Sequence, residues 1–303
     1  MGMEQLFVII LTGFVIVAFV LIYRNREEAE ANLGYKIVGY YLLGAFTFRL
    51  NEYALPVGFV VFLLFFRPAK NIKAKQHSAY LGLAFYLLQL IVPYVEEYIY
   101  EYPREVAASS SNIYEVQFTN DWTAIRDHMQ IDPDAHLEKF HARYQKDGEI
   151  EKLSYILVSR AADGFIHYDV DYSAKTKAYS IHRTKVGDQW GQFDRTVFAA
   201  RFFEVLDQAQ VRNLSAQSGD EGNYLISDGE IASYDIKKSQ KFRIQEEEII
   251  EITNDQLPIK GYYISTCKRP QVQAETAASS GLTRSRGCEQ QVDYFFDLQK
   301  EDH

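Results

Sequence analysis

Two histidines and an aspartate fall on one face of a predicted strand pair, in the stretch "FIHYDVDYSAKTKAYSIH". Because side chains alternate along a strand, His167 and Asp169 share a face, and a two-residue turn at "AK" places His182 opposite His167. Two imidazoles with a nearby carboxylate can bind zinc or share a proton. The sequence therefore predicts a metal or acid/base site at His167, Asp169 and His182. The alternative is the solvated face of a half-buried hairpin, which the poor turn chemistry of "AK" favours.

The chain has two cysteines, Cys267 and Cys288. Cys267 ends the strand-like "IKGYYISTC" and Cys288 opens "CEQQVDYFFDL", so a disulfide between them would close the mouth of a hairpin. A disulfide that closes a loop of about 20 residues lowers the entropy of the unfolded chain, and it thereby stabilises the folded chain by roughly 3 kcal/mol. We predict this disulfide. The alternative is two separately buried free thiols. A metal site is less favoured than either, because two cysteines alone do not supply the four ligands that zinc needs.

Four basic residues lie within the loop of that hairpin, namely Lys268, Arg269, Arg284 and Arg286. The loop has few large apolar residues, which is typical of a flexible segment. Its positive charge also suits docking of an acidic partner. We prefer the flexible loop and keep partner binding through these four residues as the alternative.

The remaining motifs do not define an enzyme. In "HLEKFH" the two histidines are five residues apart, about 140° on the predicted helix, unlike the i, i+4 pair of a metalloprotease. The sequence has no G-x-S-x-G, Walker or dinucleotide-binding pattern. We therefore predict no cofactor and rank binding above catalysis.

Residues 1–105 contain four apolar segments. Residues 6–23 and 79–95 approach the length that crosses a hydrocarbon core of about 30 Å. Between them, residues 37–48 and 53–66 are shorter runs separated by "RLNE", and they either cross as a thin pair or form a re-entrant hairpin. Both alternatives return the chain to the side it left. We predict a membrane α-helical half with about four spans, the middle two short.

The most basic loop beside these segments fixes the predicted orientation. Arg67, Lys70, Lys73 and Lys75 precede the last apolar segment, and basic loops stay in the cytoplasm. That segment then leaves the cytoplasm, so residues 106–303 are expected outside it. The lipid bilayer is thus a predicted partner.

Charge excludes nucleic acid as a partner. The whole chain has a net charge of -9, and the nine basic and nine acidic residues of 1–105 cancel, so the excess acid lies in residues 106–303. A surface of this sign repels phosphate backbones. We predict no nucleic-acid binding.

Short periodic segments predict a soluble α+β domain with an antiparallel sheet. Helices are expected over residues 121–129, 132–148 and 194–209, and alternating strands over 151–159, 165–173 and 177–186. Turn signals after residue 217 separate further short strands. The predicted organisation is a transmembrane unit at 1–105, a linker at 106–111 and an extracytoplasmic domain at 112–303.

Two function classes fit this organisation. The first is a membrane-anchored, non-catalytic binding, sensing or assembly module of the cell envelope, which holds another envelope protein. The second is a membrane-tethered envelope enzyme that uses His167, Asp169 and His182. The lack of catalytic motifs favours the first class.

Overall fold

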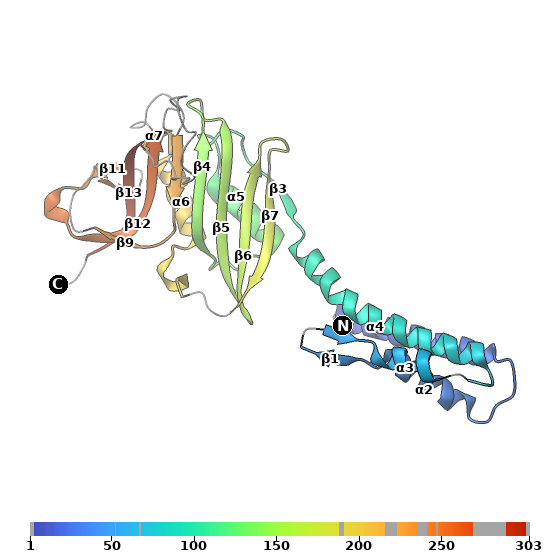
Figure 1. Ribbon diagram of the computed structural model, residues 1–303. Helices are drawn as coiled ribbons and strands as arrows, with labels where there is room; N and C mark the ends of the chain where they lie inside the picture. The colour runs from blue at the N-terminus through green and yellow to red at the C-terminus, as the bar shows by residue number, and fades with distance from the viewer. Residues whose placement is uncertain are drawn as a thin grey trace, which may run out of the picture. The chain divides into compact units, whose positions relative to one another are not determined.

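The computed structural model describes residues 3–51, 53–66, 68–187, 191–215, 223–234, 241–246, 248–268 and 289–300. The chain divides into two compact units, Met1–Tyr100 and Glu101–His303. The first is helical and the second is built on a large β-sheet (Figure 1).

The first unit contains four helices and a short hairpin. The helices are α1 (Met3–Arg24), α2 (Leu33–Ala45), α3 (Val57–Phe65) and α4 (Ile72–Glu101), and the hairpin pairs β1 (Phe48–Leu50) with β2 (Tyr53–Leu55). Small residues let α2 and α4 approach closely. A Cβ on Gly82 would meet the carbonyl oxygen of Tyr41 at 2.2 Å, and one on Gly44 would meet that of Ala79 at 2.1 Å. Glycine is therefore required at this helix crossing.

The predicted four spans are wrong. Among the described residues, α4 is the helix that is long and apolar enough to cross a membrane. The apolar stretch described in α1, Ile9–Arg24, has fewer than 18 residues, and α2 and α3 have 13 and 9. At 1.5 Å per residue, helices like α2 and α3 reach only about 20 Å and 14 Å, well short of a hydrocarbon core. Apolar composition alone did not show that the helices end so early.

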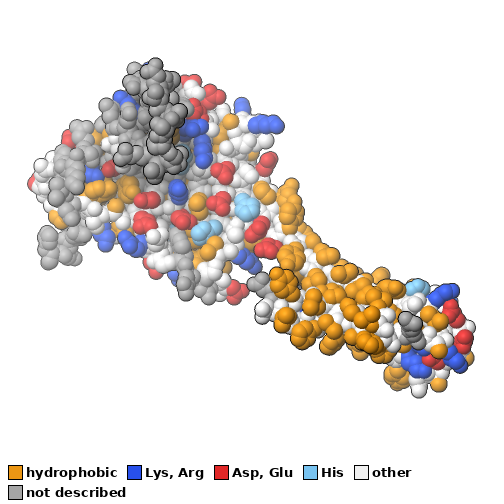
Figure 2. Space-filling view, viewed as in Figure 1, with side chains coloured by type: hydrophobic (Ala, Val, Ile, Leu, Met, Phe, Trp, Pro, Cys, Tyr) orange, Lys and Arg blue, Asp and Glu red, His pale blue; other side chains and the backbone are white. Residues whose placement is uncertain are grey.

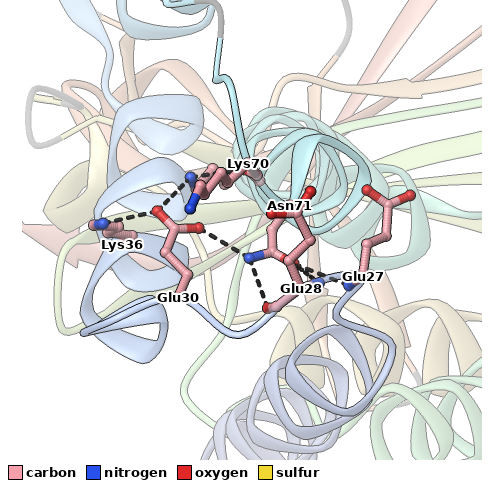
Figure 3. Close-up of polar contacts among 7 residues, drawn as sticks. Glu27, Glu28, Glu30, Lys36, Lys70 and Asn71 are labelled. Atoms are coloured by element: carbon pink, nitrogen blue, oxygen red, sulfur yellow. Dashed lines mark hydrogen bonds and ion pairs between the residues drawn. The ribbon is translucent and has the colours of Figure 1, made fainter.

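A polar cluster ties the α1–α2 loop to the start of α4 (Figure 3). It consists of Glu27, Glu28, Glu30, Lys36, Lys70, Asn71 and Lys75. Oδ1 of Asn71 accepts hydrogen bonds from the backbone N–H groups of Glu27 and Glu28, both at 2.9 Å. Nδ2 of Asn71 donates a hydrogen bond to Glu30 Oε2, also at 2.9 Å. Hydrogen bonds from Lys36, Asn71 and Lys75 lower the pKa of Glu30 to about 2. Part of the predicted basic loop therefore makes contacts within the first unit, since Lys75 bonds to Glu30 and to the carbonyl oxygen of Lys70.

The second unit is one mixed sheet of 11 strands, in which the order is β11-β10-β13-β12-β8-β4-β5-β6-β7-β3 and β9 pairs with β12. The strands are β3 (Arg104–Ala107), β4 (His136–Tyr144), β5 (Ile150–Ala161), β6 (Gly164–Ser173), β7 (Ala178–Val186), β8 (Asn223–Ser227), β9 (Ala232–Tyr234), β10 (Lys241–Gln245), β11 (Glu248–Glu251), β12 (Ile259–Lys268) and β13 (Glu289–Lys300). The predicted all-antiparallel sheet is wrong at one place, because β10 runs parallel to β13. The predicted linker also begins inside β3, which pairs with β7.

Helices α5 (Phe118–Met129), α6 (Ala199–Ala209) and α7 (Val211–Ser215) contribute to the domain's core. Phe118 of α5 and Phe202 of α6 both contact Phe140 of β4, with ring centroids 6.0 and 5.2 Å apart. These helices cover one face of the sheet. The predicted helices at 121–129 and 194–209 are confirmed as α5 and α6, although α6 begins only at Ala199.

The helix predicted over residues 132–148 is wrong, because most of this segment is β4. A β-bulge between Leu137 and Lys139 inserts an extra residue, so that Leu137, Phe140 and Tyr144 all face the core. Their spacing of three and four residues imitates a helix. Gly148, expected just after the helix, instead has φ +92° in the turn before β5.

Candidate binding face

The face of β4–β7 opposite to the helices carries polar side chains in cross-strand rows. In one row, His141 lies opposite Ser154, which lies opposite Asp171. In the next row, Ile156 lies opposite Asp169, which lies opposite His182. We call this surface the open face, because no described helix covers it. Figure 2 shows acidic, basic and histidine side chains mixed on the domain in this view.

The predicted pairing of His167 with His182 is wrong by two residues. His167 lies opposite Thr184, and His182 opposite Asp169. The loop between β6 and β7 has four residues rather than two, with Lys177 in the left-handed region at φ 52°. Because a slip of two preserves the side-chain direction, the prediction that these residues share a face is confirmed.

The structure brings Asp169 and His182 together but gives His167 a different neighbour. His167 Nδ1 lies 3.5 Å from Glu138 Oε2 on β4. The Thr184 hydroxyl lies 3.3 Å from His182 Nδ1. Among the residues that the structure describes, no group of three or more His, Cys, Asp or Glu side chains is arranged to hold a metal ion.

A hollow of about 300 Å³ lies on the open face between β4, β5 and β6. Its polar lining residues are Lys139, His141, Lys152, Ser154, Asp169 and Asp171. Nδ1 of His141 is buried and has no hydrogen-bond partner among the described residues. A buried ring nitrogen without a partner costs free energy, so the ring of His141 carries an unsatisfied polar atom beside the hollow.

The electrostatics of the hollow keep His141 neutral. Burial lowers the pKa of its imidazole, and the positive charges of Lys152, Arg143 and Lys139 lower it further. At neutral pH the ring therefore has one nitrogen that donates and one that accepts a hydrogen bond. Two ammonium groups and two carboxylates complete a surface of mixed charge.

This arrangement does not form a catalytic triad. In a triad, the histidine lies between the hydroxyl and the carboxylate, so that it can take the hydroxyl proton while the carboxylate orients it. Here Ser154 lies between His141 and Asp171, and no hydrogen bond joins the three.

The predicted disulfide and most of the predicted basic docking segment lie outside the described residues. Cys267 is fully buried on β12, whereas Cys288 is not described. Lys268 ends β12, and Arg269, Arg284 and Arg286 lie in the segment that is not described. Both proposals therefore stay predictions.

Sequence reasoning missed the contribution of β4 to this face. The sequence pattern places Lys139 and His141 on a helix, which hides their cross-strand partners Ile156 and Ser154 on β5. A strand signal was present, since Phe140, Ala142 and Tyr144 alternate with polar residues and are all buried. The signal is only five residues long because the bulge interrupts it.

The two units define a protein with an apolar helical part, which includes one helix able to cross a membrane, and an α+β domain with an open polar face. A family model described as an archaeal family matches residues 119–289, more than half of the chain, and the chain belongs to this family. The match includes the whole hollow on the open face. No curated protein and no solved structure matches the chain.

Proposed function

We propose that this protein is a membrane-anchored, non-catalytic binding module. Helix α4 crosses the membrane, and the α+β domain holds another envelope protein on its open face outside the cytoplasm. The observation that carries the binding role is the hollow with its charged lining. Lys139, Lys152, Asp169 and Asp171 make no ion pair with any described residue, and a surface of mixed charge selects a partner of complementary charge.

The surface of the first unit supports a membrane location. Among the described residues, every large hydrophobic side chain that is exposed lies in the first unit, except Tyr102, Phe198 and Leu298. Figure 2 shows these side chains as a continuous apolar surface. An apolar surface of this extent needs lipid or protein to cover it.

The charges at the two ends of α4 support the proposed orientation. Lys70 and Lys73 lie at its start, whereas Glu96, Glu97 and Glu101 lie at its end. The more basic end of a span stays in the cytoplasm, which places residues 106–303 outside. This argument uses α4 alone and does not depend on the number of other helices. A disulfide between Cys267 and Cys288 belongs to the same proposal, because it needs an oxidising compartment.

We expect the full chain to stay in the membrane pellet after alkaline carbonate extraction. Replacing Leu88 and Ile91 of α4 with lysine should release most of it, because each charge at the middle of a span costs about 2.5–3.5 kcal/mol. The matched control replaces Val158 and Leu157 of β5 in the same way, which damages the domain and leaves the pellet fraction unchanged.

The orientation has its own readout. Because Cys267 is fully buried, the readout uses Asp127→Cys, which puts a thiol at an exposed position of α5. This cysteine should react with a membrane-impermeant maleimide on intact cells. Labelling that requires broken cells would place the domain in the cytoplasm. Complete release of the wild-type chain by carbonate would remove the membrane anchor from the proposal.

The binding role is tested by photo-cross-linking in the membranes of the cells that make the protein. A benzoylphenylalanine at position Ser154 should give an adduct of one defined mass, whereas the same group at His128 on α5 should give none. Changing Asp169 and Asp171 to lysine should reduce the adduct at least about tenfold, since like charges then face the partner. The control Asp127→Lys changes an exposed carboxylate on α5 and should leave the adduct unchanged.

Two results would argue against the binding role. One is an equal adduct from both positions, which indicates random collision. The other is an adduct that survives the two lysine substitutions, which means that the hollow does not hold the partner.

A further inference from the structure

A second cavity, separate from the hollow, lies where the segment Thr196–Phe198 runs beside the start of β4. Its volume is about 450 Å³. The side chains that matter for its chemistry are Asp132, Asp134, His136, Arg160, Asp194 and Phe198. We call it the His136 cavity. It has room for a small organic ligand.

His136 is only 6% exposed and has one ring nitrogen available. Its Nδ1 lies 2.7 Å from the carbonyl oxygen of Thr196, and since a carbonyl can only accept, Nδ1 carries the proton. The ring lies between Phe193 and Phe198, at centroid distances of 4.1 and 4.4 Å. Nε2 is therefore a hydrogen-bond acceptor, and it has no partner among the described residues. His136 lines the cavity.

The charge around this nitrogen is negative. Arg160 is partly neutralised, because it lies 3.5 Å from Asp194 and 4.9 Å from the centre of the Phe193 ring. Asp132 and Asp134 make no ion pair within the described chain, and both are exposed at the rim. Burial lowers the pKa of His136, so the imidazole adds no opposing positive charge.

An aromatic surface completes the cavity. Phe198 is 50% exposed, which is unusual for this domain, and its ring covers one side of the His136 ring. An exposed ring beside carboxylates attracts a cation, and it offers apolar surface to the carbon chain attached to that cation. The described residues offer no group of three metal-ligating side chains here, so the cation they fit is organic.

We infer that the His136 cavity binds a primary ammonium group on an apolar stem. The ammonium group donates a hydrogen bond to His136 Nε2, and the negative charges of Asp132 and Asp134 at the rim attract it. The stem lies against Phe198. Both a free aliphatic amine and the lysine side chain of a peptide present this chemistry. The inference does not depend on the partner proposed for the open face.

Titration calorimetry of the full chain in detergent tests this inference with three probes. Cadaverine represents a free amine. Lysine with an acetylated α-nitrogen and an amidated carboxyl group (acetyl-lysine-amide) represents a peptide lysine with a free side-chain ammonium, and 1,5-pentanediol is a neutral molecule of similar length. We expect binding of at least one amine and none of the diol. Heat from cadaverine alone identifies a free amine as the ligand, and heat from acetyl-lysine-amide alone identifies a peptide lysine.

Variants connect the heat to the cavity. Asp132→Asn with Asp134→Asn should weaken binding about fivefold or more, and Phe198→Ala about twofold to fivefold. The control Asp127→Asn removes an exposed carboxylate on α5 and should bind as the wild type does. Equal affinity for the amines and the diol, no binding of either amine, or the same loss in the control would each overturn the inference.

Discussion

Replacing Lys241 with methionine should lower the free energy of unfolding of the domain by about 3–5 kcal/mol. Lys241 and Asp293 are each only 5% exposed, and their Nζ and Oδ2 atoms are 3.0 Å apart. The pair lies in register between the parallel strands β10 and β13. Removing the ammonium leaves a buried carboxylate without its counter-charge, which costs more than the attraction itself.

The neighbours of Asp293 explain why it is charged in the folded protein. Burial opposes the charge, but hydrogen bonds from Ser265, Gln291 and Lys241 outweigh it and hold the pKa of Asp293 below its usual range. Its charge therefore stabilises the fold above pH of about 4, and this contribution is lost as the pH falls toward the lower folded-state value. Stability between about pH 5 and pH 3 should fall less steeply in the Lys241→Met protein, because its Asp293 has lost part of that support.

Urea unfolding of the full chain in detergent measures this effect. Both tryptophans, Trp122 and Trp190, are in the second unit, so their fluorescence reports the domain alone. Lys152→Met, an exposed strand lysine without an ion-pair partner, serves as the control and should change stability by no more than about 0.5 kcal/mol. The double variant Lys241→Met, Asp293→Leu should recover part of the loss, since it buries no lone charge. Equal losses in the single and control variants would show that the pair contributes nothing.

The sequence could not predict this ion pair, because its members are far apart in the chain and come together only through the parallel pairing of β10 with β13. It could predict α5 and α6, whose apolar spacing is local and regular. The β6–β7 hairpin could be predicted only in part. The alternation of side chains gives the correct faces, but the register depends on the turn, and the predicted turn is wrong.

The same distinction applies to the candidate sites. Asp169 and His182 could be placed on one face because their strands have clear alternation. His136 and His141 could not be placed on a strand, because the bulge in β4 gives the segment that contains them the apolar spacing of a helix. In the first unit, composition showed which segments are apolar but not where each helix ends. Local pattern thus decided what could be predicted, and pairing between distant segments decided what could not.

Phe202→Ala should also lower the free energy of unfolding by about 3–5 kcal/mol. Phe202 is fully buried on α6, and its ring centroid lies 5.2 Å from that of Phe140 on β4 and 6.3 Å from that of Phe296 on β13. It therefore packs one helix against two separate parts of the sheet, and truncation leaves a cavity that neither part can fill. Phe202→Leu, which keeps most of the volume, should cost only about 1–2 kcal/mol.

Phe198 offers a matched control four residues earlier in the chain. It is 50% exposed, so Phe198→Ala should change stability by no more than about 1 kcal/mol in the same urea experiment. Equal losses for the two alanine variants would mean that Phe202 is not the packing residue described here. Phe202 does not line the His136 cavity, whereas Phe198 does. Under conditions where both variants are folded, Phe202→Ala should therefore bind amines as the wild type does, and Phe198→Ala should bind them about twofold to fivefold more weakly. This difference separates the residue that holds the domain together from the residue that contacts a ligand.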